Sequence, residues 1–138
     1  MENKQDNPKI LKTKYIPTAE FYSQIIDSLQ DYSIFTLDKE FKINSWSFGS
    51  IKIFGYETDE VIGEPFDIIF TEDDIKSGIP KREIEIALKE GRATDNRWHI
   101  AKDKSLFYAY GLVFPLTGLD GELLGYVKIL RDLTDRKQ

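Results

Sequence analysis

The sequence predicts an α+β fold in which short helices cover one face of a single five-stranded antiparallel sheet, preceded by an amphipathic helix. Five strand-like segments are too few for two packed sheets, and the remaining helical segments fall between the second and third of them. The 138 residues, of which 41% are hydrophobic and 13% aromatic, are enough for one domain around one core.

The N-terminal part divides into two segments. Residues 1–17 are polar and interrupted by prolines, so we expect a disordered leader there. Residues 18–31 carry apolar side chains at four-residue steps, which predicts an amphipathic helix with Thr18 as its N-cap. We expect this helix to cover the outer face of the sheet or to pair with a second copy, giving a homodimer. The candidate interface residues are Phe21, Tyr22, Ile25 and Leu29.

Strand and helix signals then follow in order. Residues 33–37 and 41–46 are rich in β-branched and aromatic side chains and are joined by a polar turn, which predicts a β-hairpin. Residues 47–70 are expected to form three short helices, because glycine and proline interrupt them. A longer helix is expected at 80–90, where a proline lies in the first turn and a glycine follows the last.

Three more strands are expected after this helix, at 96–101, 106–116 and 123–133. The segments between them have turn compositions, and one of these segments contains Asp120-Gly121, which suits a tight hairpin. Three consecutive strands joined by short turns form an antiparallel meander. Because short helices cover a curved sheet incompletely, we expect a pocket between the helices and the sheet.

Composition and motifs argue against several functions. The formal net charge is −5 and the basic residues are scattered, which argues against nucleic acid as a partner. The absence of cysteine excludes disulfides and thiolate sites and is compatible with a cytoplasmic location. No segment has the apolar length of a signal peptide or a membrane span, so we expect no direct membrane insertion. The single histidine, His99, lies in no catalytic or metal-binding motif, and we expect no catalytic residues and no metal site.

Three segments resemble the motifs of the PAS family of sensory domains, in the family's order and spacing. Residues 51–65 resemble the F-G-Y-x-x-x-E-V-I-G signature, and residues 98–108 resemble the W-x-x-R-K-D-G-S-x-F-W hairpin. Residues 125–137 resemble the closing R-D-L-T-E-R-K segment. The resemblance implies a PAS fold over residues 32–134, with an output linker starting at 135–138. Similar sequences occur in sensor histidine kinases and other bacterial signalling proteins.

The resemblance implies a regulatory domain and not an enzyme. Its expected function is sensing and dimerisation, with control of a covalently linked effector such as the histidine kinase of a two-component system. The implied output residues are Arg131, Asp132 and Thr134. Asp132 can accept a hydrogen bond from the Thr134 backbone N–H, and Thr134 can cap a following helix. Two other functions stay open, namely a protein–protein docking module without a small ligand and a flavin or haem redox sensor.

Lys128 is the unusual residue of the expected ligand pocket. Strand alternation places it on the same face as Leu130, whose position lines the pocket in the family, and a buried ammonium group is costly without an anionic partner. One solution is a ligand that carries a carboxylate. The second, which we expect, is a local bulge or a lysine side chain that reaches the pocket rim beside an acidic surface residue. The candidate pocket residues are Phe35, Trp46, Phe54, Tyr56, Phe66, Ile69, Leu88, Trp98, Lys128 and Leu130.

The resemblance also bears on cofactors. Light-sensing flavin domains of the family carry an adduct-forming cysteine where Phe66 stands, so that photochemistry is excluded here. Haem-binding members usually use a histidine on the long helix, and residues 80–90 contain none. We therefore expect no cofactor, with haem disfavoured and non-covalent flavin left open.

Two residues depart from the family pattern. Ser47 stands where asparagine is usual, and its hydroxyl can cap the following helix in the same way. Lys104 stands where the family has a turn glycine. The turn must therefore avoid a positive φ at Lys104, or tolerate it at a cost of about 1 kcal/mol.

Overall fold

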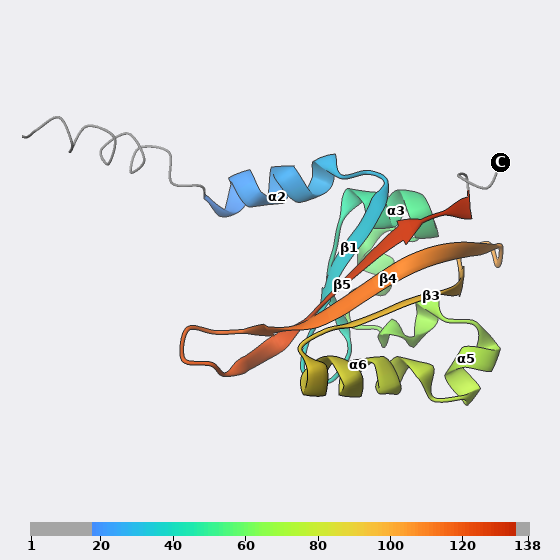
Figure 1. Ribbon diagram of the computed structural model, residues 1–138. Coiled ribbons are helices and arrows are strands. Elements are labelled where there is room, and N and C mark those ends of the chain that lie inside the picture. Colours follow the sequence, from blue (N-terminus) through green and yellow to red (C-terminus); the bar gives the residue numbers. More distant parts are fainter. Residues whose placement is uncertain (1–17, 135–138) are drawn as a thin grey trace, which may run out of the picture.

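The computed structural model describes residues 18–134, and the predictions for residues 1–17 and 135–138 lie outside this range. Its strands form one antiparallel sheet with the spatial order β2-β1-β5-β4-β3 (Figure 1). The predicted α+β fold with a five-stranded sheet is confirmed. The strands are β1 (Tyr32–Leu37), β2 (Ile43–Trp46), β3 (Ala93–Ile100), β4 (Leu106–Thr117) and β5 (Leu123–Asp132).

The helices between β2 and β3 follow the expected order. The three short helices predicted for residues 47–70 are present as α3, α4 and the 3-10 helix η2. The long helix α6 begins one residue earlier than expected and lies with α5 along the β3 side of the sheet (Figure 1). The helices are α2 (Ala19–Ser28), α3 (Phe48–Phe54), α4 (Thr58–Val61), η2 (Phe66–Ile69), α5 (Glu72–Lys76) and α6 (Ile79–Glu90).

One face of the sheet forms the core together with these helices. Burial alternates along β1 and through most of β5, as expected for strands with one face packed and one face open. Removal of these apolar side chains from water is the main favourable term in folding. The core contains Phe35, Leu37, Ile43, Trp46, Phe54, Val61, Phe66, Ile69, Phe70, Ile84, Ala87, Phe107, Ala109, Val113, Tyr126 and Leu130.

A serine network fixes α3 against the sheet. The Ser50 backbone N–H donates to Ser47 Oγ at 3.2 Å, which confirms that Ser47 caps this helix. The Ser33 and Ser50 hydroxyl oxygens lie 2.7 Å apart, and both residues are fully buried. The bonds satisfy hydroxyls that would be costly to bury alone, and they join β1 to α3.

Helix α2 does not cover the sheet as expected. It extends away from the sheet (Figure 1), and none of its residues is buried. A hydrogen bond of 3.0 Å from the Phe48 backbone N–H to Asp27 Oδ1 joins its C-terminal end to α3. A groove of about 410 Å³ lies between α2 and the outer side of β1 and β2. The apolar stripe of α2 therefore stays exposed in the single chain.

The turn between β3 and β4 adopts the conformation that usually calls for glycine. Lys104 has a φ of 75°, and its backbone N–H donates to the Ala101 carbonyl oxygen at 2.9 Å. The turn therefore tolerates the positive φ. Phe41 has a φ of 70° as well, which no sequence feature had indicated.

Replacement of Lys104 tests this strain. Lys104→Gly should raise the free energy of unfolding by about 1 kcal/mol, because glycine adopts a positive φ without a Cβ clash. Lys104→Ala removes the same side chain but keeps the Cβ, so it should leave stability near that of the wild type. Urea denaturation of the three proteins measures the difference, and equal midpoints for the glycine and alanine variants would contradict the prediction.

Candidate functional site

Lys128 lies inside the domain, where its ammonium group meets a carboxylate of the same chain. The side chain is 1% exposed, and its Nζ donates to Glu83 Oε1 at 2.6 Å. β5 lies between β1 and β4 and keeps a regular register at this position, opposite Phe35 and Val113. The expected bulge or rim position is therefore wrong, because a central strand gives the lysine no route to solvent. An internal partner stabilises the buried charge instead.

Helix α6 positions this partner. Its buried residues are Pro80, Glu83, Ile84 and Ala87, which follow the spacing of one helix face. Glu83 thus occupies a core position, which the sequence did not indicate, because a charged residue on a helix normally faces solvent. Leu88 follows the buried Ala87 directly and therefore points away from the buried face of the helix. It is 51% exposed, so its expected place in the pocket is wrong.

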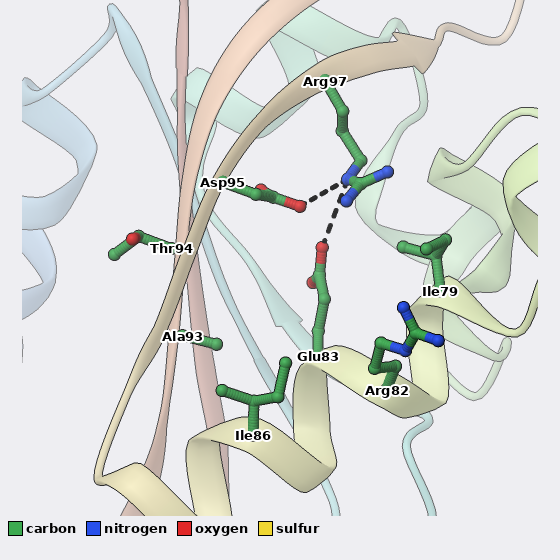
Figure 2. A pocket seen from close by; sticks show the side chains of 8 residues that line it. All are labelled: Ile79, Arg82, Glu83, Ile86, Ala93, Thr94, Asp95 and Arg97. Atoms are coloured by element: carbon green, nitrogen blue, oxygen red, sulfur yellow. Dashed lines mark hydrogen bonds and ion pairs between the residues drawn. The ribbon is translucent and has the colours of Figure 1, made fainter.

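Two alternating residues of β3 continue the charged region. Arg97 Nε donates to Asp95 Oδ2, and Arg97 Nη1 donates to Asp74 Oδ2 of α5 at 3.1 Å. Arg97 Nε also lies 3.5 Å from Glu83 Oε2 (Figure 2). We call Lys128, Glu83, Asp95, Arg97 and Asp74 the charge cluster.

A glycine makes room for the charge cluster. Gly111 of β4 pairs with Asp95, and a Cβ at Gly111 would lie 3.0 Å from Asp95 Oδ1 and 3.5 Å from Lys128 Nζ. Glycine is disfavoured within strands and often marks a close approach of other groups. Its presence here is explained by the side chains that fill the space in front of it, which include Leu130, whose Cδ2 would also lie 3.0 Å from that Cβ.

Burial and neighbouring charges shift the proton affinities of the cluster. Burial, reinforced by Asp95, raises the pKa of Glu83 to about 7, against the lowering effect of Lys128. Burial also acts to raise the pKa of Asp95, but its interaction with Glu83 and the cations Lys128 and Arg97 lower that pKa on balance. The pKa values of the two carboxyl groups thereby move in opposite directions, and Glu83 is the group that takes up a proton near neutral pH.

His99 is a buried structural residue. Its Nδ1 lies 2.8 Å from the Ile69 carbonyl oxygen, so this nitrogen carries the proton and donates it. Within residues 18–134, Nε2 has no hydrogen-bond partner. Burial, followed by the charge of Lys128, lowers the pKa of His99 to about 4. The ring is therefore neutral at physiological pH. Trp98 points to the opposite face and is 48% exposed, so its expected place in the pocket is wrong.

The other predicted pocket residues face the interior. Tyr56 is half-buried at the edge, where its carbonyl oxygen accepts a hydrogen bond of 3.0 Å from Trp46 Nε1. Binding of a ligand by these residues stays a prediction. The buried residues of the set are Phe35, Trp46, Phe54, Phe66, Ile69, Lys128 and Leu130.

The predicted output residues close the last strand. Asp132 Oδ1 accepts a hydrogen bond of 2.9 Å from the Thr134 backbone N–H, which confirms that expected contact. Thr134 Oγ1 accepts a hydrogen bond of 2.9 Å from the Tyr108 backbone N–H, so β4 also holds the exit segment. The Arg131 guanidinium lies 5.6 Å from the Tyr32 ring centre. The predicted helix cap by Thr134 involves residues outside the described range.

Residues 18–134 contain neither a metal-binding cluster nor a membrane-spanning helix. No group of three or more metal-ligating side chains is placed to hold an ion. No helix in this range is long and apolar enough to cross a membrane.

The effects of Glu83 and His99 on the pH dependence of the free energy of unfolding should cancel. Between about pH 4.5 and 6.5 the folded domain keeps a proton on Glu83 and none on His99, whereas the unfolded chain has the reverse. Proton uptake on folding is therefore near zero for this pair. Glu83→Gln removes the Glu83 proton from this balance, so that only His99 contributes. The free energy of unfolding of this variant should fall by about 1.4 kcal/mol per pH unit as the pH is lowered through this window.

Thermal or urea unfolding at several pH values measures this effect. Glu85→Gln is the matched control, because Glu85 is an exposed carboxylate on the same helix. Its pH profile should follow that of the wild type. Parallel profiles for Glu83→Gln and the wild type would contradict the assignment.

Solved structures of other proteins share this fold. The PAS domain of a protein from Colwellia psychrerythraea has a TM-score of 0.77 at 23% identity, covering 85% of this chain and 98% of that one. An RNA-binding light-oxygen-voltage receptor has a TM-score of 0.71 at 20% identity, covering 89% and 35%. The PAS domain of a LuxR-family transcriptional regulator from Burkholderia thailandensis, solved with ethanol, has a TM-score of 0.65 at 18% identity, covering 80% and 96%. At these identities the likeness shows the fold alone.

Sequence comparison gives a relative and a family. Two-component system protein A of Emericella nidulans is 35% identical over 130 residues, which cover 94% of this chain and 19% of that protein. The chain thus spans about a fifth of the length of this curated relative. The PAS domain family model matches residues 31–135. The chain belongs to the PAS domain family.

Proposed function

We propose that this PAS domain senses a signal and controls an effector linked to it, with a histidine kinase as the first candidate. The exit segment is the observation that carries the proposal. Asp132 and Thr134 fix the end of β5 to itself and to β4, at the place where a continuing chain would leave the domain. The name of the two-component relative supports a kinase setting, and so does the small share of that protein which this domain would occupy.

β5 connects the interior to this exit. Lys128 and Asp132 lie on the same strand, both on its inward side, so a change at the charge cluster acts on the strand that leads out. Regulation requires two arrangements of the strand or of its exit segment. It also requires a ligand or partner whose binding free energy differs between them by a few kcal/mol. The hydrogen bonds at Thr134 are the contacts that would differ between the two arrangements.

The proposal also includes a homodimer. The apolar residues of α2 are between 37% and 54% exposed, on a helix that its own domain leaves unburied. The outer sheet face is apolar as well, because Ile34, Ile129 and Leu112 form a row across β1, β5 and β4. A second copy would cover both surfaces.

No flavin or haem is part of the proposal. Phe66 is buried in the core, and its ring centre lies 5.3 Å from that of Phe70. The position at which the light-sensing domains have their cysteine is therefore occupied here by an apolar ring that packs in the core. The Nδ1 of His99 is bonded to a carbonyl oxygen, which removes one of the two nitrogens that an iron centre could use. We place the domain in the cytoplasm, because it has no cysteine and its composition suits a reducing compartment.

Replacement of Asp132 tests the output. Asp132→Ala removes the acceptor of the Thr134 N–H, so amide exchange at Thr134 should accelerate while the core keeps its protection. In the intact parent protein the same variant should uncouple the effector from its signal, measured as autophosphorylation if the effector is a histidine kinase. Asp132→Asn keeps an acceptor oxygen and serves as the control. Unchanged regulation in the alanine variant would refute the proposal.

Light scattering after size exclusion tests the dimer. The wild type should have twice the mass of one chain, and Ile25→Glu should weaken the association, because it puts a charge into the apolar stripe of α2. Gln24→Glu adds the same charge on the neighbouring exposed position and should leave the dimer intact. A monomeric wild type at micromolar concentration would remove dimerisation from the proposal.

A further inference from the structure

We propose that the cavity between α6 and β3 binds a small aliphatic amino acid as a zwitterion. The ammonium group would lie against Glu83 and the carboxylate against Arg82. This inference rests on the proposed sensory function and names the class of ligand that the domain would sense.

The cavity has the size and the lining for such a ligand. Its volume is about 250 Å³, which is below the roughly 300 Å³ at which pockets for drug-sized molecules begin. Ile79 and Ile86 of α6 and Ala93 of β3 supply its apolar wall (Figure 2). Charged side chains from the same two elements complete the lining, so the cavity is amphipathic.

Glu83 provides a buried carboxyl oxygen in this cavity that receives no hydrogen bond from another described residue. Its side chain is 8% exposed, and among residues 18–134 its Oε2 has no hydrogen-bond donor. Arg97 Nε lies 3.5 Å from Oε2, but that N–H already donates to Asp95. In the free domain a proton on Glu83 is the hydrogen available to this oxygen and to the neighbouring Asp95, and a bound ammonium group could replace that proton because it brings N–H donors to the same oxygen.

The charge cluster is one positive charge short. It contains three carboxyl groups, those of Glu83, Asp95 and Asp74, but only two cations, Lys128 and Arg97. In the free domain a proton on Glu83 fills this deficit, in keeping with the raised pKa of that residue. A ligand ammonium group would replace the proton.

Arg82 supplies the opposite charge at the edge of the same cavity. It is exposed, lines the cavity from the position next to Glu83, and forms no ion pair with any residue that the structure describes (Figure 2). A simple amine would be repelled by Arg82, and a simple carboxylate would be repelled by Glu83 and Asp95. A zwitterion with an apolar side chain satisfies all three parts of the cavity.

Calorimetric titration with L-valine tests the inference on the purified domain. L-Valine should give a saturable isotherm, while isobutylamine and 3-methylbutanoate, which each lack one charge, should bind more than about tenfold more weakly. At pH 6 binding should release about one proton, seen from titrations in buffers of different ionisation enthalpy, because the ammonium group displaces the Glu83 proton. Amide shifts in NMR spectra should concentrate at residues 79–86 and 93–97.

Variants assign the two charges. Glu83→Gln and Arg82→Ala should each lower the affinity for L-valine by about tenfold or more, and Arg82 is exposed, so that variant keeps the fold intact. Lys89→Ala removes an exposed cation from the same helix outside the cavity and should bind as the wild type does.

Two results would overturn the inference. One is the absence of saturable binding for L-alanine, L-valine and L-leucine alike, and the other is equal binding of isobutylamine and L-valine. Either result leaves the proposed sensory function standing, since the Asp132 variants test the output without any ligand.

Discussion

The ion pair between Lys128 and Glu83 is the contact on which the interior of this domain depends. It joins the central strand β5 to the longest described helix, and both side chains lie where apolar groups normally pack. Removal of one partner from a buried pair typically costs about 3–5 kcal/mol, because the other charge is left without compensation. A well-packed apolar pair could be at least as stable. The pair therefore matters chiefly through the cost of breaking it and less through a net gain over apolar packing.

The pair also divides the interior into two halves. On the side of β1, β2 and α3, the inward positions carry apolar side chains and the small serine network. On the side of β3 and α6, the inward positions Asp95, Arg97 and His99 are polar. The first half holds the fold together, and the second half is where a polar ligand or a proton can change the energy of the domain.

Alternation and turn residues were sufficient to predict the fold from sequence. The strands of the meander, the short helices and the cap at Ser47 all depend on residues close together in the chain. The predictions failed where distant elements decide the outcome. Lys128 was assigned to a bulge or to the rim, because its partner Glu83 lies 45 positions away and on another element. Leu88 and Trp98 are candidate pocket residues in the sequence, but the burial of Glu83 and of His99 fixes the inward side of the helix and of the strand, and both candidates lie on the other side.

The position of β5 has a consequence for the order in which the domain can fold. β1 and β2 form one pair and β3 and β4 another, and each pair is local in sequence. β5 joins them, because it continues the meander beside β4 and also pairs with the distant β1, where Tyr32 lies opposite Arg131. Such contacts between distant residues form late, because the loop they close is long. The sheet is thus incomplete until the last strand has left the ribosome, and the exit segment takes its place only on a finished domain.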